Sequence, residues 1–241
     1  MAKGKYRRPA RTSVSSFRRR IAGVEATGSA ILVVTEGVNT EPAYYNTLKR
    51  RFAAPTVELV AYGKGAGDPR VLTDVALELR KERRREAKAN ELPIDQPADF
   101  DELWIVFDAD VLTSEKLNNG IAYAGSKGVG IALSQPCFEF WLLLHDGNAY
   151  TTAPMAKCAN VVPYLKRAYG WTSYSKNAAD VEDLIAPLVE KTKVRTAIQA
   201  AEKVRNHHAS AGTPFPANPS TDVDQLIRSI NGALPISRRF L

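Results

Sequence analysis

Short apolar runs alternate along this chain with segments of helical hydrophobic periodicity, and this order limits the folds open to it. The runs at 30–34, 103–107 and 129–133 contain no polar residue, as is typical of strands buried on both faces of a parallel sheet. A further strand is predicted at 57–61, and a helical segment follows each strand. The order predicts an α/β fold with a mostly parallel sheet flanked by helices.

The chain begins with a strongly basic segment. Its first 20 residues carry eight basic side chains and no acidic one, while the whole chain of 241 residues has a net charge of +7. We predict that residues 1–27 form a disordered arm that contacts nucleic acid, with Arg18, Arg19 and Arg20 among the contacts. A solubility tail, or an arm that associates weakly with ribosomes, would have the same charge.

The remaining chain divides by its hydrophobic pattern. Residues 28–150 are predicted to form the α/β domain, and residues 151–241 a helical C-terminal region packed on it. In this region Pro163 and Pro187 are expected to interrupt two helices. The predicted helices are 157–168, 178–191, 193–206 and 221–232.

Composition excludes several classes of protein. No apolar run approaches the roughly 20 residues that a membrane span needs, and no signal peptide is recognisable, so we predict a cytoplasmic protein without a membrane partner. The two cysteines, Cys137 and Cys158, are too few for a disulfide framework, and no CxxC pair indicates zinc.

Three acidic residues follow predicted strands directly: Glu36 after the first, and Asp108 and Asp110 after the third. Parallel sheets bind ligands beyond the carboxyl ends of their strands. Converging carboxylates repel one another unless a cation neutralises them, and oxygen ligands favour Mg²⁺ or Mn²⁺. We therefore predict a metal site suited to phosphoryl transfer or phosphodiester cleavage. A strand-end turn or a helix start would also explain each acid separately.

Other residues are candidates on weaker grounds. Glu139 lies in the first turn of an apolar helix, where an acid completes a metal shell, positions a base or only favours the helix dipole. Lys64, in a glycine-rich loop that lacks the P-loop spacing, is a candidate phosphate contact. The roles of Glu41 and His145 stay open, since both also suit purely helical positions.

Several short motifs along the chain match, in the same order, those of a known family. The Ser134–His145 segment is the most specific of them. With Glu36 and the Asp108-Ala-Asp110 stretch on neighbouring strands, the arrangement resembles a Toprim domain, the fold of topoisomerases, primases and a group of nucleases. More narrowly, the chain resembles the RloB-like family, with Gln135 where the family usually has Asn. The matching segments are Val34–Gly37, Thr40–Pro42, 105–110, Ser134–His145 and Asn218–Val223.

The resemblance implies roles for these residues. Glu36 would be the acid/base or metal-positioning carboxylate, Asp108 and Asp110 would hold Mg²⁺ or Mn²⁺, and Glu139 and His145 match family motif positions. It implies a metal-dependent nuclease acting on RNA such as tRNA, or on DNA. It also implies an effector of an abortive-infection or phage-defence system with an ATPase partner.

Two alternatives remain open from the sequence. A non-catalytic subunit that binds nucleic acid or an ATPase would keep the acids without using them. A phosphatase of the haloacid-dehalogenase type also has an Asp-x-Asp motif after an apolar strand, but Leu112 stands where that motif has Thr or Val.

Overall fold

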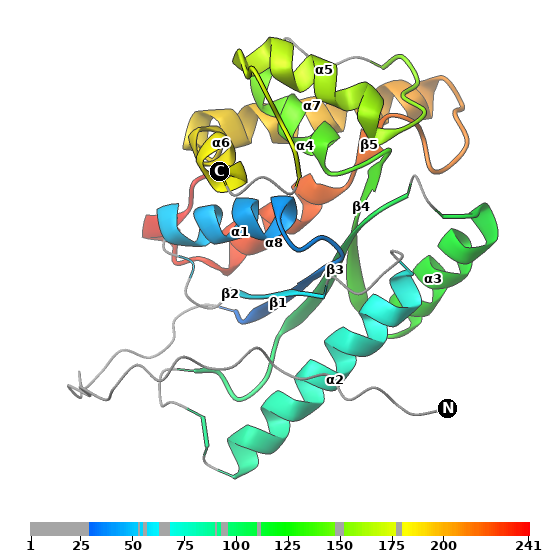
Figure 1. The fold of residues 1–241 in the computed structure, drawn as a ribbon. Helices are drawn as coiled ribbons and strands as arrows, with labels where there is room; N and C mark the ends of the chain where they lie inside the picture. The colour runs from blue at the N-terminus through cyan, green and yellow to red at the C-terminus, as the bar shows by residue number, and fades with distance from the viewer. Residues whose placement is uncertain are drawn as a thin grey trace.

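A five-stranded sheet runs through the centre of the protein, as the computed structural model shows (Figure 1). Its strands are β1 (Ile31–Thr35), β2 (Val57–Ala61), β3 (Glu102–Asp108), β4 (Val129–Gln135) and β5 (Ser220–Thr221). The structure describes residues 29–52, 54, 57–62, 68–89, 91–92, 96–109, 112–147, 152–176 and 180–241.

The strand order is β2-β1-β3-β4-β5, with the first four strands parallel and β5 antiparallel to β4. This confirms the prediction of an α/β fold with a mostly parallel sheet, and the arrangement is consistent with a Toprim-like fold. The short strand β5 was not predicted. Ser134 pairs with Thr221 in it, so the C-terminal region contributes to the sheet itself.

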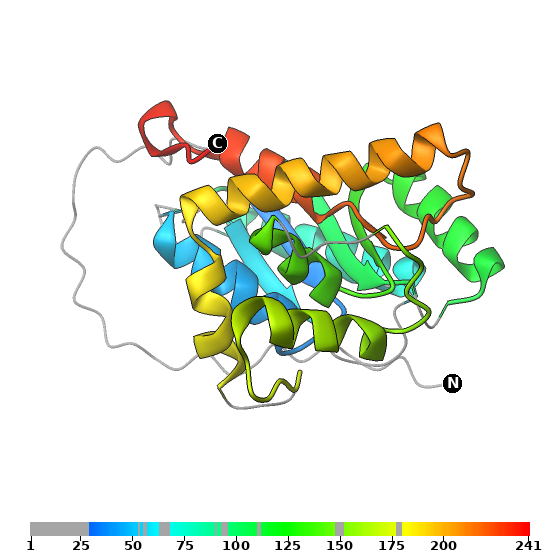
Figure 2. The same cartoon turned by 90° about the horizontal axis from the view of Figure 1, so that it is seen from above.

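Helices cover both faces of the sheet (Figures 1 and 2). They are α1 (Thr40–Arg51), α2 (Pro69–Lys88), α3 (Ser114–Ser126), α4 (Glu139–Leu143), α5 (Cys158–Tyr169), α6 (Val181–Ile185), α7 (Lys191–Ser210) and α8 (Val223–Ala233). Three 3₁₀ turns, Leu144–Asp146, Ala186–Leu188 and Ile236–Arg238, complete the described elements. The helices α2 and α3 pack on one face, and α1, α4 and α8 on the other, with α5, α6 and α7 further out.

Two helix predictions in the C-terminal region need correction. Pro163 lies inside α5 without ending it, whereas Pro187 lies in the 3₁₀ turn after α6, where the chain leaves the helix. The last helix begins at Val223, because Thr221 belongs to β5 and bonds through its hydroxyl group to Ser134.

Alternate side chains of each strand enter two separate cores. Ile31 and Val33 of β1 face α1 and α4, whereas Leu32 and Val34 face α2 and α3. This double burial explains the uninterrupted apolar runs of the sequence. Among the described residues, no helix has both the length and the apolar character to cross a membrane.

Candidate functional site

Glu36 and Asp108 meet at the carboxyl edge of the sheet. The strands β1 and β3 are neighbours in parallel register, with Thr35 opposite Val106. The amide of Glu36 continues this ladder by donating to the carbonyl oxygen of Val106 at 2.9 Å. The amide of Asp108 donates to Oε2 of Glu36 at 3.2 Å. Both acids therefore lie together, in the place where parallel sheets bind ligands.

The carboxylate of Asp108 is held by two donors. Its Oδ1 accepts a 2.8 Å hydrogen bond from the amide of Phe138, just before α4, and its Oδ2 lies 3.4 Å from Nζ of Lys176. The side chain is only 14% exposed. Burial raises the pKa of Asp108 well above its usual value, Lys176 opposes that rise, and Glu41, Glu139 and Glu36 add to it.

Glu139 is the first residue of α4 and is fully buried. Its Oε1 accepts a 2.7 Å hydrogen bond from the hydroxyl group of Tyr174, and its Oε2 lies 3.0 Å from Nζ of Lys176. A buried carboxylate is costly unless it is paired and hydrogen-bonded, and here it has both kinds of partner. Glu139 therefore belongs to the same cluster as Asp108, with Lys176 between them.

Lys176 and Tyr174 belong to this cluster although no sequence pattern predicted them as site residues. The carboxylates of Glu139 and Asp108 raise the pKa of Lys176 although burial acts against its charge. Burial, followed by the charge of Glu139, raises the pKa of Tyr174, so its hydroxyl group stays a donor. The only sequence signal is that both belong to a stretch of aromatic and basic residues after α5.

Glu41, in the first turn of α1, is a further acid of the cluster. Burial raises the pKa of this carboxyl group to about 7; a backbone hydrogen bond opposes the rise, and Glu139 adds to it. Gly37 makes the approach possible, because a Cβ atom there would lie 2.1 Å from Oε2 of Glu41. The Glu36-Gly37 and Thr40-Glu41 motifs are therefore related, because the missing side chain of Gly37 leaves the space that the carboxylate of Glu41 occupies.

The two cysteines, for which no bond was predicted, are joined as the disulfide Cys137–Cys158. Sγ of Cys158 lies 3.0 Å from Oε2 of Glu139. In the part of the chain that the structure describes, these three residues are the only group whose potential metal ligands all lie within 4.8 Å of one another. Because the sulfurs bond to each other, they are not free to bind a metal. The carboxylate oxygens of Glu36, Asp108 and Glu139 do not form a group of this kind.

The remaining predicted site residues fall outside the described part of the chain, with the exception of His145. Asp110, Lys64 and the arm residues Arg18, Arg19 and Arg20 fall outside the described residues. His145 lies in the core, where its Nδ1 bonds to the carbonyl oxygen of Trp141 at 3.0 Å and its Nε2 to the hydroxyl group of Tyr44 at 3.1 Å. Since a carbonyl oxygen only accepts, Nδ1 carries the proton and Nε2 accepts from Tyr44.

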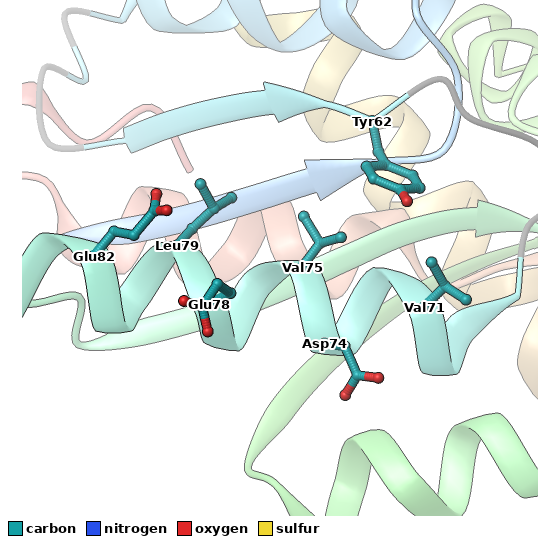
Figure 3. Close-up of a pocket in the computed structure, with 7 residues that line it drawn as sticks. All are labelled: Tyr62, Val71, Asp74, Val75, Glu78, Leu79 and Glu82. Atoms are coloured by element: carbon teal, nitrogen blue, oxygen red, sulfur yellow. The ribbon is translucent and has the colours of Figure 1, made fainter. Parts of the chain in front are cut away.

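One hollow of about 260 Å³ lies on the opposite side of the sheet, between α2 and the end of β2 (Figure 3). Val71, Val75 and Leu79 line its floor, and acidic side chains of α2 and Tyr62 border it. None of the carboxylates of the cluster lines this hollow.

Comparison with known proteins identifies the family. A family model described as "RloB-like protein" matches residues 31–230, which include every strand and all eight helices named above except the end of α8. No curated protein and no solved structure gives a significant match. The match covers most of the chain, and the chain therefore belongs to the RloB-like family.

Proposed function

We propose that this protein is a metal-dependent nuclease that hydrolyses phosphodiester bonds of RNA, such as tRNA, or of DNA. One observation carries the proposal: four acidic side chains of the described residues cluster at the carboxyl edge of a parallel sheet. They are Glu36, Asp108, Glu139 and Glu41, with Lys176 among them. Such a concentration of acidic side chains is typical of sites that bind a divalent cation, because the cation favours their charged forms.

The donor set suits Mg²⁺ or Mn²⁺. The acids offer only oxygen atoms, which these hard cations prefer, and Lys176 opposes the raised pKa values of Asp108 and Glu41. Glu36 and Asp108 would hold the metal, together with Asp110. A bound divalent cation would stabilise negative charge on the phosphate and lower the pKa of a coordinated water molecule.

The chain's own groups have complementary roles in this proposal. Glu36 accepts a proton from the attacking water or orients it. Lys176, whose side chain is 44% exposed, donates to a phosphate oxygen from its place between Asp108 and Glu139. Glu41, which interacts electrostatically with Glu139 and Glu36, would add negative charge beside the metal.

A cleavage assay tests the proposal. Purified protein is incubated with labelled tRNA or plasmid DNA in Mg²⁺, in Mn²⁺ and in EDTA. Cleavage in either metal, and none in EDTA, is expected for the wild type. Glu36→Gln and Asp108→Asn should abolish it, and Glu115→Gln, an exposed acid of α3, should not. Cleavage that persists in EDTA or in both site variants would contradict the proposal.

A non-catalytic subunit is the second candidate, because Lys176 already neutralises part of the charge of Asp108 and Glu139. In that case Mg²⁺ would not raise the melting temperature of the wild type, and the melting temperature of Asp108→Asn would be equally insensitive to Mg²⁺. The full chain is needed for this test, since deletion of 151–241 would remove β5 and α8 from the fold.

A phosphatase of the haloacid-dehalogenase type has less support. Leu112 stands where that motif has Thr or Val, and Asp108 lies at the end of the third strand in the chain, whereas the motif follows the first. Turnover of a small phosphate ester by the wild type, with no nucleic-acid cleavage, would reverse this preference.

The defence role and the ATPase partner rest on the family resemblance. We include them as part of the proposal: the protein would be the effector of an abortive-infection or phage-defence system. Expression in bacteria together with a candidate ATPase partner should protect them from phage, and Glu36→Gln should remove the protection. Equal protection by the variant would count against this role.

A further inference from the structure

An aromatic–basic segment, residues 164–176, borders the acidic cluster. It consists of the last turns of α5 and the chain after it, as far as Lys176 (Figure 1). Two tyrosines anchor it to the buried helix α4: the hydroxyl group of Tyr169 donates to the carbonyl oxygen of Leu142, and that of Tyr174 donates to Glu139, each at 2.7 Å. The segment therefore ends at the residues of the candidate active site.

The aromatic rings of this segment form a row. The rings of Trp171 and Tyr174 are stacked, with centroids 5.5 Å apart and an angle of 14° between their planes. Tyr169 continues the row at 5.1 Å from Trp171. All three rings are half-buried, and Tyr164 on α5 is 39% exposed, with the guanidinium group of Arg167 above it. Part of this aromatic surface is thus open to solvent.

The charge of the segment has one sign. Between Asp146 and Asp180 the sequence contains no acidic residue, and its basic residues are Lys157, Lys166, Arg167 and Lys176. Lys166 is half-buried and Arg167 exposed on α5, while Lys176 lies at the acids. The positive groups therefore extend from the outer surface of α5 to the candidate active site.

Rings interleaved with cations match the chemistry of an unpaired nucleic-acid strand. Each base of such a strand exposes a face that stacks on an aromatic ring, and its phosphates pair with cations. A duplex offers the same phosphates, but its base faces are already covered by their neighbours. An acidic peptide would pair with the basic side chains, but it would not account for the row of aromatic rings.

We infer that residues 164–176 form a binding site for single-stranded nucleic acid. A nucleobase stacks on the Trp171–Tyr174 pair, and Lys166 and Arg167 hold the backbone beside it. The inference rests on the proposed function, since it assigns unpaired RNA or DNA, including the loops of a folded RNA, as the substrate of the same site.

The test measures binding separately from cleavage. Fluorescein-labelled single-stranded oligonucleotides, and duplexes of the same sequence, are titrated with the full-length protein in EDTA. We expect single strands to bind more tightly, and Trp171→Ala to weaken their binding by about tenfold while leaving duplex binding unchanged. Trp171→Phe should retain most of the affinity. Tyr123→Ala, on α3 at the opposite face of the sheet, is the matched control.

Tryptophan fluorescence supplies a second measurement that a purely structural role would not change. Trp141 is buried and Trp104 packs on the core from β3, so stacking of a base should quench mainly Trp171, and the quenching should disappear in Trp171→Phe. Replacing Lys166 and Arg167 with Gln should lower the salt dependence of binding; the same change at Lys116 and Lys127 of the α3 region should not.

The outcomes separate the two proposals. The inference would be overturned if duplexes bind more tightly than single strands, or if Trp171→Ala weakens the binding of both by the same factor. This holds even if the protein cleaves nucleic acid. Selective loss of single-strand binding would support it even if no cleavage is found, and the failure would then belong to the proposed nuclease activity.

Discussion

The two faces of the sheet bury different kinds of side chain. Under α2 and α3 the core is apolar, and the buried polar side chains described there are Thr73 and Arg83. Thr73 bonds within its own helix to Pro69, and Arg83 pairs with Glu58 across the edge strand. The opposite face buries a larger polar set: Thr35, Thr40, Glu41, Thr47, Ser134, Glu139, His145, His208, Thr221, Asp224 and Asn231.

This difference indicates where the fold is stabilised and where it performs chemistry. Apolar burial stabilises at little electrostatic cost, whereas each buried acid needs a partner that compensates its desolvation. Such a cost is typically retained at functional sites. The α2–α3 face is therefore the support, and the α1–α4 face carries the candidate active site.

After the acids that would hold the metal, the largest effect on activity is expected at Glu139. Glu139→Gln keeps an acceptor for the hydroxyl group of Tyr174 but removes the charge beside Lys176. Metal-dependent cleavage should fall by about 100-fold or more, with little change in melting temperature. Single-turnover cleavage and thermal unfolding measure the two effects. If the variant cleaves at the wild-type rate, Glu139 is not part of the active site.

On the apolar face the largest expected effect is on stability. Leu72 of α2 is buried, and Leu72→Ala should lower the free energy of unfolding by about 2–5 kcal/mol. Urea denaturation measures it. Cleavage per folded molecule should stay at the wild-type level, and a selective loss of activity would contradict the division between the two faces.

The disulfide belongs to the polar face and joins cysteines 21 residues apart. Its reduction should lower the free energy of unfolding by about 3 kcal/mol, since the unfolded chain is no longer constrained. Thermal unfolding with and without dithiothreitol measures this loss. Cys158→Ser should unfold at the lower temperature and not respond to the reductant. An unchanged wild type under reduction would mean that the bond does not stabilise the fold.

The sequence predicted the parts of this molecule that depend on local patterns. Uninterrupted apolar runs indicated β1, β3 and β4, and parallel strands necessarily bring Glu36 and Asp108 to one edge. The strand β5 was missed because two residues carry no periodicity. Its place depends on pairing with β4, far away in the sequence.

The partners of the acids could not be predicted in the same way. Lys176 and Tyr174 reach Glu139 from a segment without regular structure, so no spacing rule relates them. The same holds for Cys137 and Cys158, which meet only because α5 packs on α4. The role of His145 was open from the sequence. In the structure both of its ring nitrogens are hydrogen-bonded in the core, to Trp141 and to Tyr44.

His145 gives the core of the polar face a dependence on pH between pH 7 and pH 5. Burial lowers the pKa of His145 from 6.5 to about 4. The fold thus favours neutral imidazole, and its contribution to stability is present above pH 6.5 and lost as the pH falls towards 4. The loss at pH 5 should be about 2 kcal/mol. Urea denaturation of the wild type and His145→Asn at pH 7 and pH 5 isolates it. A constant difference between the two proteins would contradict the prediction.

The smallest effect is expected at Gly37, and it tests how closely the polar face is packed. A Cβ atom there would lie 2.1 Å from Oε2 of Glu41, so Gly37→Ala should displace that carboxylate and destabilise the fold by about 1 kcal/mol. Glu41→Ala removes the obstacle, and in that background Gly37→Ala should cost less. A double-mutant cycle by urea denaturation measures this coupling. Additive effects would mean that Gly37 is not there to make room for Glu41, and that the acid has another position.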